Sequence, residues 1–264
     1  MKVYICTDLE GISGVTHWDQ TREMTTAAYQ HARHLLTREV NACVQGCLEW
    51  NVAEPKQIVV MDGHGGGFNF VPDELHPEAT YVTGPNRPTM LPGLDESFDA
   101  AILLGYHAMA GTPQAVLAHT QSSKAGCRYW YNGRESGEIA QSALVCGHFG
   151  VPVVMVTGDE AACAEAKAFL GEAVTTVAVK KGISITCCEM VAPQRAWELI
   201  RKAAAEALSR VAQCKPYTTG LPIHARLRYL TAEIADTAGC RLSKRVDATT
   251  YERTIESPLD IVRF

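Results

Sequence analysis

The alternation of apolar runs with amphipathic segments constrains the fold of this chain more than any other feature of its sequence. Residues 100–104 (AAILL) and 151–156 (VPVVMV) are continuously apolar, as strands are when both faces of a parallel sheet are covered. Other segments space their apolar residues as a helix does, most clearly 26–50 and 192–212. This alternation predicts an α/β fold in which helices cover both faces of a mostly parallel sheet.

The best candidate for a linker is the segment 215–222, which contains two prolines and a glycine. We therefore expect a larger α/β domain over residues 1–215, which would carry any metal site. A small α+β subdomain over residues 216–264 would pack on it or beside it. Within the larger part, Asn132 and Gly133 form the dipeptide most typical of a tight β-hairpin.

Charge and hydropathy exclude several classes of partner. The 264 residues carry a formal net charge of −5 without a long run of one sign, which argues against binding to DNA or RNA. The sequence has no stretch of about 18 apolar residues, so we expect no membrane-spanning helix. Asp8 and Glu10 lie where a signal peptide needs an apolar run. We therefore expect a cytoplasmic protein.

Five side chains of the types that bind divalent metals follow expected strands or turns. Asp8 and Glu10 follow the first strand, His64 follows the second, His107 follows the fourth, and Glu138 follows the hairpin. In open α/β sheets, ligands bind beyond the carboxyl ends of the strands. Carboxylates and histidines are common ligands of zinc and related metals. The pattern predicts a metal site at this edge of the sheet.

Each of these motifs has a simpler interpretation when it is taken alone. Asp8 and Glu10 could be acids of a solvated turn, and His107 could be a hydrogen-bonded histidine of the core. The glycine-rich segment 62–67 could cradle a phosphate, but it has neither of the usual nucleotide-binding orders of glycines. His119, twelve residues beyond His107, is a candidate proton donor or acceptor or an electrostatic stabiliser.

Taken together, the motifs resemble the zinc D-aminopeptidases of dipeptide-permease operons in order and spacing. The matching residues are Asp8-Leu9-Glu10-Gly11-Ile12-Ser13-Gly14, Asp62-Gly63-His64, Leu104-Gly105-Tyr106-His107, His119-Thr120, Asn132-Gly133 and Gly137-Glu138. The resemblance extends from Met1 to about Lys181 and weakens beyond Lys215.

This resemblance implies an enzyme with two Zn²⁺ ions per chain that hydrolyses short peptides or amino-acid amides from the N-terminus. The expected substrates contain D-amino acids. The resemblance implies five metal ligands, with Asp8 as the bridge and Glu10, His64, His107 and Glu138 completing the two shells. It also implies a catalytic role for His119. Members of the family form ring-shaped homo-oligomers of stacked pentamers, so we expect a homodecamer.

Two other classes of function remain open. The first is a dinuclear metallohydrolase for another amide, an L-peptide or a phosphoester. Phosphoesterases usually place Arg or Lys near their metals, but the segments 7–14, 62–67 and 104–112 contain neither residue. Only Arg134, near Glu138, is expected to serve in this way. The second class is a ring or binding protein without activity, which the presence of all five ligands disfavours.

Overall fold

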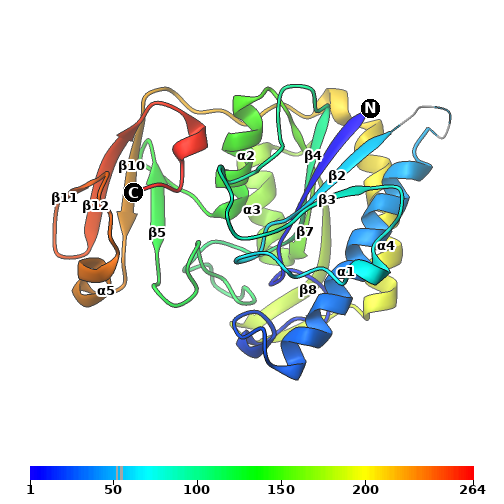
Figure 1. Ribbon diagram of the computed structural model, residues 1–264, viewed down its shortest axis with the longest axis horizontal. Coiled ribbons are helices and arrows are strands. Elements are labelled where there is room, and N and C mark those ends of the chain that lie inside the picture. Colours follow the sequence, from blue (N-terminus) through cyan, green and yellow to red (C-terminus); the bar gives the residue numbers. More distant parts are fainter. Residues whose placement is uncertain (52, 54–55) are drawn as a thin grey trace.

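Two sheets form the framework of the protein, and the larger has seven strands in the order β3-β2-β1-β4-β7-β8-β9 (Figure 1). The computed structural model describes residues 1–51, 53 and 56–264. The strands of this sheet are β1 (Lys2–Thr7), β2 (Gln57–Asp62), β3 (Thr80–Val82), β4 (Ala100–Tyr106), β7 (Val153–Asp159), β8 (Thr175–Ser184) and β9 (Cys187–Met190). Its strand pairs are parallel except for β8 with β9. The mostly parallel sheet predicted from the sequence is confirmed.

Helices cover both faces of this sheet, as expected. The covering helices are α1 (Ala27–Glu49), α2 (Glu138–His148), α3 (Glu160–Leu170) and α4 (Pro193–Ser209). The described chain also contains a short α5 (Ala232–Thr237) and the 3-10 turns η1 (Trp18–Gln20), η2 (Pro72–Glu74), η3 (Val211–Gln213) and η4 (Pro258–Asp260). Val3 and Ile5 of β1 pack in the apolar cluster that includes α1 and α4. Tyr4 and Cys6 point the other way, into the cluster that includes α2 and α3. Successive residues of a strand face opposite sides, so a wholly buried strand must be apolar throughout.

The second sheet is antiparallel and lies on the far side of α2 from the large sheet (Figure 1). Its order is β11 (Lys244–Arg245), β12 (Thr250–Ile255), β10 (Ile223–Arg228), β5 (Arg128–Tyr131) and β6 (Arg134–Glu135). Buried and exposed residues alternate along β10, and Ile223 and Leu227 pack in the same apolar cluster as Ile139 of α2. This sheet joins β5 and β6 to strands that follow residue 215. The division at 215/216 stays a prediction.

The hairpin of β8 and β9 is the main element that the sequence did not predict. From the sequence we expect a strand over residues 175–179 only. The structure continues the strand to Ser184, with the side chain of Lys180 buried. No helix in the described part of the chain is long and apolar enough to span a membrane.

Candidate metal centre

Three neighbouring parallel strands end at the same edge of the large sheet and bring the expected ligands together. β1 lies between β2 and β4, with Thr7 in register with Asp62 on one side and with Leu104 on the other. The residues that follow these positions therefore lie at the same carboxyl-terminal edge of the sheet. Asp8 extends the ladder, since its amide donates to the carbonyl of Leu104 at 2.8 Å. Glu138, the first residue of α2, approaches the same edge.

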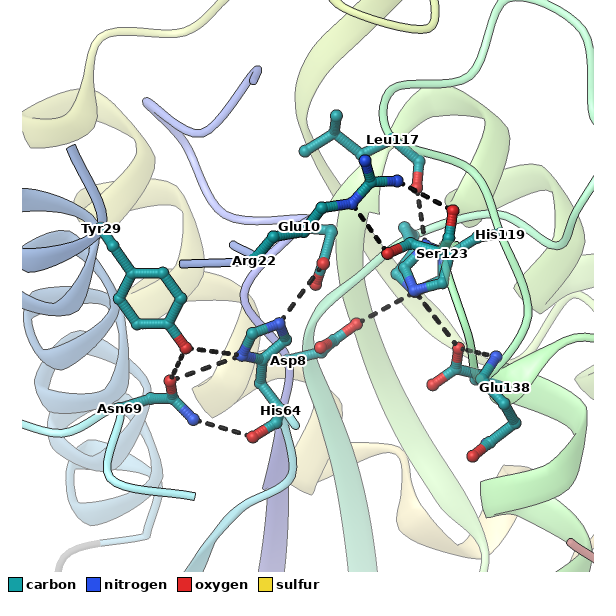
Figure 2. A network of polar contacts seen from close by, with 12 residues as sticks. Asp8, Glu10, Arg22, Tyr29, His64, Asn69, Leu117, His119, Ser123 and Glu138 are labelled. Carbon is teal, nitrogen blue, oxygen red and sulfur yellow. Dashed lines mark hydrogen bonds and ion pairs between the residues drawn. The ribbon is translucent and has the colours of Figure 1, made fainter. Parts of the chain in front are cut away.

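The six residues singled out from the sequence form one continuous cluster of polar side chains, most of which Figure 2 shows. Nε2 of His64 lies 3.3 Å from Oε1 of Glu10. Nε2 of His107 lies 3.3 Å from Oδ2 of Asp8 and 3.4 Å from Oε1 of Glu138. Nε2 of His119 lies 3.9 Å from the same Glu138 oxygen.

Two carboxylates of the cluster are buried with oxygens that no hydrogen-bond donor in the described chain satisfies. Asp8 is 7% exposed and Glu10 is 2% exposed, and the atoms that accept no hydrogen bond are Oδ2 of Asp8, which has only its ion-pair contact with His107, and Oε2 of Glu10. Burial, followed by the charge of Glu10, raises the pKa of Asp8 well above its ordinary value. Carboxylates held this close take up a proton unless a cation lies between them. The chemistry of this donor set therefore fits divalent metal ions.

Two residues that the sequence analysis missed orient the ring of His64. Its Nδ1 lies 3.3 Å from the hydroxyl of Tyr29 and 3.4 Å from Oδ1 of Asn69. The Tyr29 hydroxyl donates its own proton to Asn69 at 2.6 Å. Contacts of this kind leave Nε2 directed at Glu10 and free to bind a metal. Tyr29 lies on the long expected helix, but its spacing gave no indication that it would reach the site.

Backbone carbonyls orient the other two histidines. Nδ1 of His107 donates to the carbonyl of Ala108 at 3.0 Å, and Nδ1 of His119 donates to that of Leu117 at 2.8 Å. The His119 ring stacks on His107, with centroids 4.0 Å apart, and the ring of Trp18 meets His119 edge-on. Burial, followed by the charge of His107, lowers the pKa of His119 below its ordinary value. The neutral ring therefore presents an unprotonated Nε2 to the cluster.

Two overlapping groups of side chains have ligand atoms that all lie within 4.8 Å of one another. One is Asp8, Glu10 and His107, and the other is His107, His119 and Glu138. His119 is thus as close to a metal-holding position as the expected ligands are. The sequence analysis had separated it from them because it follows His107 by twelve residues.

The segment that follows β1 is held by a buried lysine and a buried glutamate. Nζ of Lys180 donates to the carbonyls of Glu10, Ile12 and Val15 at 2.5, 2.9 and 2.5 Å. Oε1 of Glu39, on α1, accepts the amide of Ser13 at 2.7 Å. These contacts fix the backbone that carries Glu10.

Gly11 is needed because another strand passes directly beside it. Its amide donates to the carbonyl of Gly105 at 2.7 Å. A Cβ added to Gly11 would lie 2.0 Å from the carbonyl oxygen of Tyr106, which no side chain tolerates. The small residues after Glu10 therefore admit the end of β4.

A cavity of about 540 Å³ opens over the cluster. Its walls include Asp8, Glu10, His64, His119 and Glu138, together with three cationic residues, Arg22, Arg87 and Lys124. The expectation that only Arg134 could supply a cation at the site was wrong. Its guanidinium donates to the carbonyl of Ala168 and lies over the ring of Phe169 instead. The larger hollow, of about 800 Å³, lies over the second sheet and contains none of the six site residues.

The fold and the cluster together define an α/β protein with a candidate metal centre, and comparison with known proteins gives its class. The chain belongs to the M55 peptidase family, whose D-aminopeptidase profile matches residues 1–264. It is therefore a peptidase, a hydrolase that acts on peptide bonds. The resemblance inferred from the sequence is confirmed.

Two relatives are similar to it over most of its length. A D-aminopeptidase of Bacillus subtilis (strain 168) is 37% identical over 220 residues, which are 83% of this chain and 77% of that protein. The solved structure of the Zn-dependent D-aminopeptidase DppA of Bacillus subtilis, a self-compartmentalizing protease, is 30% identical and superimposes with a TM-score of 0.91. The match covers 99% of this chain and 94% of that one.

Proposed function

We propose that this protein is a dinuclear zinc aminopeptidase that removes D-amino acids from the N-terminus of short peptides or amino-acid amides. The observation that carries the proposal is the cluster itself, in which three carboxylates and three histidines lie together, all but His107 lining one cavity. The unpartnered oxygens of Asp8 and Glu10 are available for cations. Zinc suits carboxylate and imidazole ligands, and the similar Bacillus enzyme is zinc-dependent.

Asp8 is the proposed bridge between the two ions because it lies between two pairs of ligands. Glu10 and His64 contact each other on one side of it. His107 contacts both Asp8 and Glu138 on the other side. We assign one pair to each ion.

The chemistry of the site combines the metals with His119. When bound, the two ions supply Lewis acidity, which polarises the scissile carbonyl and lowers the pKa of a water molecule. His119 is neutral because burial lowers its pKa, and Leu117 occupies its Nδ1. Its Nε2 can therefore accept a proton and deliver it to the departing amine. The stacked ring of His107 and the edge of Trp18 hold His119 in this orientation.

We further propose that the protein assembles into a closed homodecamer in the cytoplasm. A peptidase whose site opens at the edge of a sheet would threaten other proteins unless their access is restricted. A ring restricts access by size, and the similar Bacillus protease is self-compartmentalizing.

Metal analysis and a substrate panel test this function together. Protein purified without chelator is expected to contain two zinc ions per chain. It should hydrolyse D-aminoacyl p-nitroanilides with kcat/KM at least about tenfold above the L-isomers. Chelator-treated protein is the control for metal dependence, and p-nitrophenyl phosphate tests the phosphoesterase alternative.

A metal content that never exceeds one per chain would overturn the dinuclear centre. A preference for L-isomers or for the phosphate ester would overturn the proposed substrate.

A further inference from the structure

The active-site cavity is lined by both acidic and basic side chains. Asp8, Glu10 and Glu138 belong to the proposed metal centre. The basic residues of the lining are Arg22, Arg87 and Lys124. The metal ions account for the acids, but nothing in the proposed reaction accounts for the cations.

Arg87 has a structural role that engages its whole guanidinium. Its Nε donates to the carbonyl of Gly84 at 3.1 Å. Its Nη1 and Nη2 donate to the carbonyls of Gly63 and Asp62 at 2.9 and 2.6 Å. Arg87 therefore fixes the glycine-rich loop that carries His64, and it has little capacity left for a ligand.

Arg22 is held in place but keeps its charge unpaired. Its Nε and Nη2 donate to Oγ and the carbonyl of Ser123 at 3.0 and 2.8 Å, and its guanidinium stacks on the ring of Trp18 at 3.7 Å. Within residues 1–51, 53 and 56–264, no carboxylate forms an ion pair with it and its Nη1 donates to no group. A positioned guanidinium with a free edge is suited to bind a carboxylate.

Lys124 adds a second, more exposed positive charge to the lining of the cavity. Its ammonium is well exposed and lies 3.5 Å from Oε1 of the equally exposed Glu23, so solvent screens that pair. Lys124 follows Ser123 directly, and the bonds from Arg22 to Ser123 place the two cations on contacting loops.

The position of Arg22 relative to His119 sets the length of the ligand. Trp18 contacts both residues: Arg22 lies 3.7 Å from its ring, and the His119 centroid is 5.8 Å from it. The distance from the Arg22 guanidinium to the centre of the His119 ring therefore cannot exceed the sum of these two distances. A peptide advances by about 3.3–3.6 Å per residue, so one or two residues beyond the scissile bond reach the guanidinium.

We propose that Arg22, assisted by Lys124, binds the free C-terminal carboxylate of the substrate and so directs the enzyme to dipeptides and tripeptides. This inference rests on the proposed aminopeptidase function and names the feature by which the substrate is selected. An internal residue of a longer peptide has no carboxylate at this place, and an amidated peptide has none at its end.

The test compares D-alanylglycine with D-alanylglycinamide, which differ only in the charged end. We expect zinc-loaded wild-type protein to hydrolyse the free acid with a kcat/KM about 10–100-fold higher, mostly through KM, as suits a charge-assisted hydrogen bond. Arg22→Gln should reduce this ratio to about one. Arg22→Lys, which keeps the charge, should restore part of it. Arg195→Gln removes an exposed arginine on α4 that pairs with Glu198 and should leave the wild-type ratio.

The outcomes distinguish a carboxylate anchor at Arg22 from a purely structural role of this residue. A wild-type ratio near one, with both peptides hydrolysed, would overturn the carboxylate anchor and leave the aminopeptidase function standing. Equal losses on both peptides in Arg22→Gln would show that Arg22 only maintains the loop, which also overturns the anchor. Zinc content and circular dichroism of the variant identify a folding defect, and in that event the wild-type ratio and Arg22→Lys decide. If wild-type protein hydrolyses neither peptide, the proposed function fails as well.

Discussion

The replacement of Glu39 by Gln tests whether a buried acid beneath the metal centre is protonated in the folded protein. Glu39 lies on α1 and is completely buried. Its Oε1 accepts the amide of Ser13, while Oε2 has no partner in the described chain. Burial raises the pKa of Glu39 from its ordinary 4.5 to about 8, although the Ser13 amide and then the charge of Lys180 act to lower it.

The raised pKa makes stability depend on pH in a definite direction. Between pH 4.5 and 8 the folded protein keeps a proton on Glu39 that the unfolded chain releases, so stability falls as pH rises through this window. At about 1.4 kcal/mol per pH unit, the loss is about 5 kcal/mol over the whole window and about 3 kcal/mol between pH 6 and 8. The glutamine side chain of Glu39→Gln cannot ionise, so the variant does not lose stability in this way as pH rises.

Urea unfolding of zinc-loaded protein at fixed concentration, from pH 6 to 9, measures the effect. The free energy of unfolding of Glu39→Gln minus that of wild type should grow by about 3 kcal/mol from pH 6 to 8 and then level off. The subtraction removes the contributions of groups that do not interact with Glu39. Glu233→Gln, at an exposed acid on α5, should show no such trend. A difference that stays constant from pH 6 to 8 would mean that Glu39 is ionised in the fold.

Four further predictions concern the metal centre and the assembly. Asp8→Asn should lose at least one zinc by elemental analysis, and activity above about a tenth of wild type would show that Asp8 is not the bridge. His119→Ala should keep both metals while kcat falls by about 10²–10⁴-fold, whereas His107→Ala should lose metal and activity together; if His119→Ala also strips zinc, His119 is a ligand. Tyr29→Phe removes the hydroxyl beside His64 and should weaken zinc binding by about 10–100-fold in chelator competition, and an unchanged affinity would contradict that role. Light scattering should give a molecular mass close to that of ten chains. A stable monomer at micromolar concentration would refute the proposed decamer.

The sequence was sufficient for the parallel sheet and for the place of the candidate site. The continuous apolar runs of β4 and β7 favoured strands buried on both faces. Side chains that follow parallel strands leave the sheet at one edge, and this rule places Asp8, His64 and His107 near one another without any knowledge of the strand order. Residue type then favoured divalent metals as the ligands of that edge, although each motif taken alone also had a simpler interpretation.

Contacts between segments distant in sequence decided the rest. From the sequence, Arg134 was expected near the site because Glu138 follows it closely. In the structure its guanidinium instead donates a hydrogen bond to the carbonyl of Ala168. Arg22 lines the cavity instead, held by hydrogen bonds to Ser123. The two residues are 101 positions apart, so the sequence gave no indication of this contact.

Lys180 is a second example of a residue whose position only the tertiary structure decides. Only the folded chain supplies the three carbonyls that make the burial of Lys180 tolerable, so the sequence could not place this lysine inside a strand. The sequence by itself determined which residues are apolar and which can bind metal, and it indicated the strands that Asp8, His64 and His107 follow. The tertiary structure alone decided which side chains meet, because the position of a side chain within a strand is local information and its partner across the fold is not.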